Sequence, residues 1–195
     1  PRGFASLPMV GSSTRRVRLE GEAFFSVTDR DRPFRVETPN ASVEVVGTEF
    51  NVHAPRDNTP TTRVTVASGR VRVAGADAEG PSARTPVVLD KSGQTSRVVG
   101  IGGTPTPPET INLKYVQAWR QGGFGVVGAP LPAVLRELER RFGTTLRLRV
   151  PAAATDTMTL HYARDARLTD ILRDVCLLQN LTFRETSRGY ELVGK

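Results

Sequence analysis

Hydrophobic and polar residues alternate in short runs through the first half of the chain. The run at 16–19 (RVRL) is one example, and further runs follow up to residue 99, separated by turn-forming stretches such as 90–93 (DKSG). A period of two residues is typical of strands with one buried face. Residues 15–99 therefore predict short strands without a helix, arranged as an all-β sandwich, a jelly roll or a short β-solenoid.

Two glycines mark changes in the direction that these side chains face. Val43 and Val45 before Gly47 lie at odd positions, whereas Phe50 and Val52 after it lie at even positions. The valines before Gly69 lie at even positions, and those after it lie at odd positions. Because one extra residue inverts the facing of everything that follows, Gly47 predicts a bulge or a tight bend. Gly69 predicts a hairpin or a corner between stacked strands.

The hydrophobic period changes in the second half of the chain. Hydrophobic residues are spaced there by three and four positions, which is typical of one face of a helix. They are Leu131, Val134, Leu135, Leu138 and Phe142. Pro132 suits the first turn of this helix, and Gly143 suits its C-terminal end. A strand is expected next, since Leu146 and Leu148 alternate with arginines.

The same pattern returns 37 residues later. Its hydrophobic positions are Leu168, Ile171, Leu172 and Val175. Asn180 stands where the first copy has its glycine, and asparagine also adopts the left-handed conformation that ends helices. Strands near 124–127 and 157–160 would precede the helices, and strands at 182–185 and 189–193 would close the fold. The second half therefore predicts a small α+β domain of duplicated β-α-β units.

Glycine and proline dominate residues 100–110, where no apolar period is present. This composition predicts a linker. The sequence thus divides into an all-β domain at 1–99, the linker at 100–110 and an α+β domain at 111–195. Trp119, the only tryptophan, is expected to pack as an anchor between the linker and the second domain.

The net charge of +7 comes mainly from arginines that are scattered along the chain. A nucleic-acid-binding arm would need a block of basic residues, so we expect no nucleic-acid partner. No apolar run is long enough to span a membrane, and the first residues lack the features of a signal peptide. We therefore expect a fragment of a longer protein. The single cysteine, Cys176, excludes an internal disulfide and is expected to be a buried, inert thiol.

Residues that would form an active site are not grouped in this sequence. The two histidines, His53 and His161, fall in different halves, and no nucleophile motif accompanies either. No spacing of cysteine and histidine indicates zinc. Residues 123–128 match G-x-G-x-x-G by letter, but a poor strand precedes them and no acidic residue follows at the spacing that ribose recognition needs. We therefore expect no enzyme activity, no cofactor and no metal.

Five segments of the first half carry a recognisable signature. They are 17–27 (VRLEGEAFFSV), 32–36 (RPFRV), 43–52 (VEVVGTEFNV), 66–73 (VASGRVRV) and 89–94 (LDKSGQ). Together they resemble the FecR-type regulators, a family of anti-sigma factors. The stretch from Ala118 to Phe142 is similar to the C-terminal part of the same proteins. That part resembles the secretin and TonB short N-terminal (STN) domain, which is itself a duplicated β-α-β unit. The resemblance extends over residues 15–195.

The resemblance implies a role in cell-surface signalling. In that family a cytoplasmic segment holds an extracytoplasmic-function (ECF) sigma factor, and a single transmembrane helix follows. The periplasmic region then receives a signal from the signalling domain of an outer-membrane TonB-dependent transporter, often one for iron-siderophore complexes. The sigma-binding segment, the membrane helix and the usual opening strands do not precede residue 15. We therefore expect the periplasmic receiver region of a protein anchored in the inner membrane.

An open sheet edge in the second domain is the expected docking site, because unpaired backbone groups accept a strand from a partner. The expected contact residues are Val126, Val127, Thr157, Thr159, Arg147 and Arg149. The two arginines would attract an acidic partner, or they form only a solvated surface. The alternative function is a structural or polysaccharide-binding envelope module. That module would need exposed aromatic platforms, whereas aromatic residues are only 6% of the chain.

Overall fold

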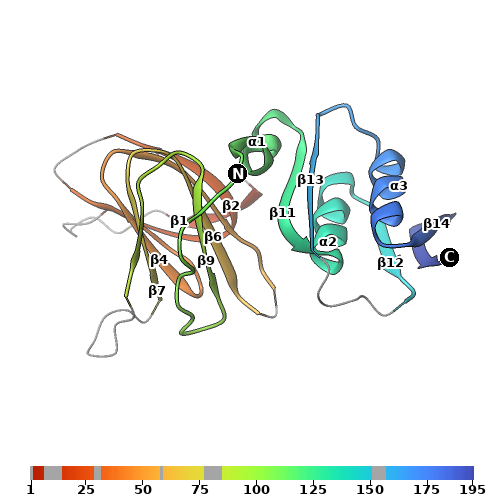
Figure 1. Cartoon of the computed structure of the whole chain (residues 1–195), viewed down its shortest axis with the longest axis horizontal. Coiled ribbons are helices and arrows are strands. Elements are labelled where there is room, and N and C mark those ends of the chain that lie inside the picture. Colours follow the sequence, from red (N-terminus) through yellow and green to blue (C-terminus); the bar gives the residue numbers. More distant parts are fainter. Residues whose placement is uncertain (1, 7–14, 29–31, 58, 77–84, 151–156) are drawn as a thin grey trace. The chain divides into compact units, whose positions relative to one another are not determined.

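The computed structural model of the chain describes residues 2–6, 15–28, 32–57, 59–76, 85–150 and 157–195. The chain folds into two compact units, Pro1–Leu113 (unit 1) and Lys114–Lys195 (unit 2). Unit 1 is built from strands, and unit 2 combines strands with helices (Figure 1). Among the described residues, no helix has the length and hydropathy needed to cross a membrane.

Ten strands are present among the described residues of unit 1. They are β1 (Arg2–Ser6), β2 (Arg15–Val27), β3 (Phe34–Glu37), β4 (Ala41–Val45), β5 (Thr48–Ala54), β6 (Thr61–Ser68), β7 (Val71–Gly75), β8 (Val87–Leu89), β9 (Gln94–Val99) and β10 (Glu109–Thr110). They form one sheet in the order β10-β9-β6-β5-β2-β3-β4-β7-β8, with β1 paired to β2. The all-β prediction for this part is confirmed, although β1 and β10 lie outside the range predicted to form strands.

The long strand β2 belongs to both halves of this sheet. Residues 15–18 pair in parallel with β3, and residues 21–27 pair antiparallel with β5. The sheet therefore curls on itself (Figure 1), and side chains from both halves meet in one hydrophobic core. Fully buried members of this core are Val36, Val43, Val73, Phe50, Val52 and Val64.

Gly47 and Gly69 lie at the two corners where the chain passes between the halves of the sheet. Both have a positive φ, 65° and 88° respectively. β6 pairs with β5 and β9, whereas β7 pairs with β4 and β8, so Gly69 forms a corner and not a hairpin. A Cβ at position 69 would lie 2.7 Å from the carbonyl oxygen of Gly47 and 2.9 Å from the Thr48 hydroxyl. The two corners therefore pack against each other, which favours glycine at 69.

The segment 100–110 lies within unit 1 and follows β9. Its last two residues form β10, which pairs with β9. The N–H of Thr106 donates a 2.8 Å hydrogen bond to the carbonyl oxygen of Arg97. A Cβ at Gly103 would overlap the carbonyl oxygen of Val99. Glycine and proline here allow the backbone to lie close to β9; the role of this segment as a linker stays a prediction.

The described residues of unit 2 form two sheets and two longer helices. Its elements are α1 (Leu113–Gln117), the 3-10 helix η1 (Ala118–Gln121), β11 (Phe124–Pro130), α2 (Leu131–Phe142), β12 (Thr145–Leu148), β13 (Thr157–Tyr162), α3 (Leu168–Leu178), β14 (Leu181–Thr186) and β15 (Gly189–Gly194). β11 and β13 form an antiparallel pair, called here the β11–β13 ribbon, and β12-β15-β14 form a three-stranded sheet. Strand, helix and strand follow one another twice along the chain. The likeness to the STN domain stays a prediction.

The hydrophobic core of unit 2 combines side chains from both sheets and both helices. The buried helix residues are Leu131, Val134, Leu135, Leu138, Ile171, Leu172, Val175 and Cys176. The helix faces predicted from the sequence are therefore the faces that pack, although Leu168 and Phe142 are only half-buried. Gly143 (φ 64°) and Asn180 (φ 52°) adopt the left-handed conformation that the sequence assigned to them.

Candidate functional site

The β11–β13 ribbon carries four of the six expected contact residues. The side chain of Val126 packs against the hydrophobic core of unit 2, and Val127 is half-buried. Thr157 and Thr159 are exposed. The hydroxyl of Thr159 accepts a 3.0 Å hydrogen bond from the N–H of Gly128, where the pairing of the two strands is irregular. The ribbon thus exposes these two threonines, whereas Val126 packs against the core.

Unit 2 offers several strand edges. Each strand of the ribbon pairs only with the other one among the described residues. In the three-stranded sheet, β15 is central, and β12 and β14 are the outer strands. An outer strand has a row of N–H and C=O groups that point away from its partner. Such a row accepts a further strand by backbone hydrogen bonds.

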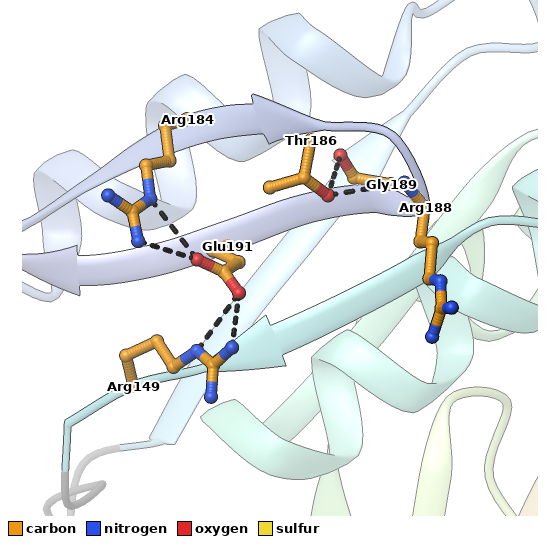
Figure 2. A network of polar contacts seen from close by, with 6 residues as sticks. All are labelled: Arg149, Arg184, Thr186, Arg188, Gly189 and Glu191. Atoms are coloured by element: carbon orange, nitrogen blue, oxygen red, sulfur yellow. Dashed lines mark hydrogen bonds and ion pairs between the residues drawn. The ribbon is translucent and has the colours of Figure 1, made fainter.

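The other two expected contact residues, Arg147 and Arg149, lie on the three-stranded sheet. Arg149 follows β12 and donates a 3.0 Å hydrogen bond from Nε to Oε1 of Glu191 on the central strand. Arg184 on β14 donates to the other oxygen, Oε2, from Nε at 3.1 Å and from Nη2 at 2.8 Å. Figure 2 shows the two guanidinium groups converging on this one carboxylate. The network therefore links all three strands of the sheet.

Glu191 is the least exposed member of this network. Its side chain is 11% exposed, whereas those of Arg149 and Arg184 are 51% and 67% exposed. The hydrogen bonds from Arg149, and then those from Arg184, hold the pKa of Glu191 below its ordinary value because they stabilise the charged form. Arg147 lies opposite Glu191 in the strand register, yet its side chain has no hydrogen bond or ion pair with another described residue.

A shallow pocket of about 260 Å³ adjoins this network at the turn between β14 and β15. It is lined by Thr145, Arg147, Thr186, Ser187, Arg188, Tyr190 and Glu191. Thr186 closes the turn, because its hydroxyl donates to the carbonyl oxygen of Gly189 at 3.1 Å (Figure 2). The guanidinium groups of Arg147 and Arg188 lie at this opening together with the hydroxyls of the threonines, Ser187 and Tyr190. These groups can donate hydrogen bonds to a carboxylate.

The sequence did not indicate Glu191 or Arg184 as members of a site. Arg149 and Glu191 are 42 residues apart in the chain, and only strand pairing brings them together. Conversely, the six expected residues do not form one cluster. The ribbon holds four of them and the three-stranded sheet holds two.

Two glycines of the 123–128 segment, Gly123 and Gly125, have packing roles. A Cβ at Gly125 would overlap the carbonyl oxygen of Tyr115, and a Cβ at Gly123 would lie 2.6 Å from the carbonyl oxygen of Tyr162. Arg141, in the last turn of α2, donates to the carbonyl oxygens of Gly122 and Gly123. These glycines therefore allow close approach of the backbone around the start of β11. The segment 123–128 follows a 3-10 helix and lies almost entirely within the strand β11, whereas a dinucleotide-binding turn follows a strand and opens a helix.

Cys176 is 4% exposed, and burial raises the pKa of its thiol. Trp119 lies in η1 and is half-buried. In the part of the chain that the structure describes, no three side chains of His, Cys, Asp or Glu gather as a metal site would require.

Comparison with known proteins connects both units to one family. The family model described as FecR protein matches residues 7–72, and the model described as FecR, C-terminal matches residues 126–191. A solved structure of a candidate anti-sigma factor from Parabacteroides distasonis ATCC 8503 is 26% identical, with a TM-score of 0.80 over 98% of this chain and 86% of that chain. A second structure with the same description has a TM-score of 0.78 and 26% identity, over 96% of this chain and 83% of that chain.

No curated protein sequence matches the chain. The two family models nevertheless cover most of the chain in the order FecR and then FecR, C-terminal. The structural likeness extends over both units. The chain therefore belongs to the family of FecR-type anti-sigma factors.

Proposed function

We propose that this chain is the periplasmic receiver region of a transmembrane anti-sigma regulator. In this proposal, unit 2 binds the signalling domain of an outer-membrane TonB-dependent transporter, and the complete protein passes the signal to an ECF sigma factor. The observation that carries the proposal is the match of both parts of the chain to FecR models. Iron or siderophore uptake is the process that such a transporter would serve.

The strand edges of unit 2 support docking by strand addition. Backbone hydrogen bonds supply affinity in this mode, and side chains that alternate along the added strand supply selectivity. Thr157 and Thr159 are exposed on an outer strand of the ribbon. Exposed threonines leave room for a partner strand and contribute hydroxyls to it.

The charge of the three-stranded sheet supports an acidic partner. Arg149 and Arg184 carry two positive charges, and Glu191 carries one negative charge. Arg147 adds a further positive charge beside them. An excess of positive charge on one sheet face raises the rate at which an acidic surface docks. Such steering weakens as the salt concentration rises.

The experiment is a titration of the whole chain with the signalling domain of the cognate transporter, followed by variants of unit 2. Arg147→Glu and Thr157→Glu are each expected to weaken binding by about 5-fold or more, since each adds a charge that repels an acidic partner. Arg173→Glu is the matched control, because Arg173 is 68% exposed on α3, away from both surfaces. Equal loss in all three variants would contradict the assigned surfaces. Intact binding in all three would also contradict them.

A further inference from the structure

A hollow of about 790 Å³ lies on the outer face of the sheet in unit 1, over β2, β3, β4 and β7. Its charged side chains form what we call the arginine basin: Arg16, Arg18, Arg35, Arg56, Arg72, Glu20, Glu37 and Glu44. Strand register places four of them in one row. Arg16 is opposite Arg35, Arg35 is opposite Glu44, and Glu44 is opposite Arg72. The row therefore crosses four strands.

Each carboxylate on the inner strands of the basin is shared by two guanidinium groups. Glu37 pairs with Arg16 at 3.1 Å and with Arg18 at 3.4 Å. Glu44 likewise pairs with Arg72 at 3.0 Å and also with Arg35.

The third carboxylate pairs at the rim of the basin. Glu20 pairs there with Arg56 at 2.6 Å. Five guanidinium groups thus face three carboxylates in the same hollow, which leaves two positive charges in excess.

Four of the five arginines of the basin are more exposed than any of its carboxylates, of which Glu20 is the most exposed at 42%; Arg35, at 22%, is the exception. The side chains of Glu37 and Glu44 are 24% and 27% exposed, whereas those of Arg18, Arg56 and Arg72 are 80%, 84% and 50% exposed. A guanidinium group has five N–H donors, and one ion pair uses only one or two of them. An anion that enters the basin therefore finds donors without breaking the pairs already present.

We propose that the arginine basin binds an acidic, extended peptide segment of a partner protein. Charged positions along these strands repeat every two residues, as at Arg16 and Arg18, which corresponds to about 6.8 Å. An extended peptide with acidic residues at alternate positions projects its carboxylates from one face at the same interval. Each carboxylate can then accept two parallel hydrogen bonds from one arginine. This site lies in unit 1 and does not depend on docking at unit 2.

The probe is a fluorescently labelled peptide that alternates glutamate with serine, measured by anisotropy with the whole chain at low salt. The control probe has the same composition with its glutamates in one block. The double variant Arg18→Gln/Arg72→Gln is expected to lose about 10-fold or more in affinity for the alternating peptide. The matched control is Arg167→Gln/Arg173→Gln, which removes the same charge from exposed positions in unit 2 and is expected to leave the affinity unchanged.

Four outcomes would overturn the proposal. They are absence of binding by the alternating peptide, equal affinity for the block peptide, equal affinity in the double variant, and tighter binding of a sulfated glycan such as heparin. The last would make the basin a glycan site. Thermal unfolding of each variant checks that it folds. The single variant Arg18→Gln, at a side chain that is 80% exposed, gives a second reading of the same test.

Discussion

The hydroxyl of Thr62 donates a 2.6 Å hydrogen bond to Oδ1 of Asn40, and both residues are fully buried. Asn40 precedes β4, in one half of the curled sheet of unit 1, and Thr62 lies on β6 in the other half. Nδ2 of Asn40 donates to the carbonyl oxygens of Val98 at 2.8 Å and Pro60 at 2.9 Å. One amide group therefore links the two halves of the sheet at the end of the core.

Replacing Asn40 with alanine should destabilise unit 1. The substitution removes the hydrogen bonds that Asn40 makes with the Thr62 hydroxyl and with the carbonyl oxygens of Val98 and Pro60. Each lost hydrogen bond costs about 1 kcal/mol. We expect a loss of about 2–4 kcal/mol in the free energy of unfolding, measured by guanidinium denaturation followed by circular dichroism. Ser92→Ala, at an exposed turn residue, is the control and should change stability by less than about 0.5 kcal/mol. A similar stability for the two variants would refute the role of Asn40.

The Glu191 carboxylate should make unit 2 sensitive to acid. Its pKa is lowered in the folded state by hydrogen bonds from Arg149 and Arg184. The stability that it contributes is therefore complete above the unfolded pKa, near ~4.3, and is lost as the pH falls through the lower folded value. The fluorescence of Trp119, in unit 2, reports the unfolding. We expect the melting temperature to fall below about pH 4.5.

The variant Glu191→Gln distinguishes the acid sensitivity caused by the Glu191 carboxylate from that caused by the other carboxylates of the chain. The variant should be less stable at neutral pH, and its melting temperature should depend less on pH between about 5 and 3. Glu185→Gln is the matched control on β14, since Glu185 is exposed. Equal pH slopes for the native chain and Glu191→Gln would show that the carboxylate does not hold the sheet.

The glycines of β11 should differ sharply in their tolerance of alanine. Gly125→Ala places a methyl group on the carbonyl oxygen of Tyr115 and should cost about 2–4 kcal/mol of stability. Gly128→Ala meets no atom within 4 Å but keeps a φ of 51°, which should cost about 1–2 kcal/mol. Denaturation followed by Trp119 fluorescence gives both values. A larger loss of stability in Gly128→Ala than in Gly125→Ala would contradict the packing role of Gly125.

The thiol of Cys176 should report the unfolding of unit 2. Burial raises its pKa, so both access and thiolate formation are suppressed in the folded state. We expect Ellman's reagent to react with the native chain at least about 100-fold more slowly than with the chain in denaturant. Fast labelling of the native chain would show that the α3 face is not buried as described.

The helices of unit 2 could be predicted in detail because their signal is local. Leu131, Val134, Leu135 and Leu138 lie within two turns, and their spacing alone identifies the face that packs. The left-handed ends at Gly143 and Asn180 are also local, since residue type limits the backbone conformation there. By contrast, the composition of 100–110 suggested a linker. The pairing of β10 with β9 depends on a nearby strand edge, which a local pattern does not contain.

The order of strands in unit 1 and the polar networks could not be predicted for the same reason. β6 and β7 are neighbours in the sequence but lie in different halves of the sheet, because Gly69 turns a corner there. The arginine basin and the Glu191 network also join residues from distant strands. Arg147 and Arg149 were singled out as charges on a strand. The pairing of Glu191 with Arg149 depends on the register of β15, which the sequence pattern does not contain.

Binding of the transporter's signalling domain is the most direct test of the receiver function. Isothermal titration calorimetry of the whole chain with the signalling domain of the cognate TonB-dependent transporter should give a saturable heat with one binding site. The affinity should weaken as salt rises, because the surface proposed for docking is basic. Absence of binding when both proteins are at high micromolar concentration would contradict the account.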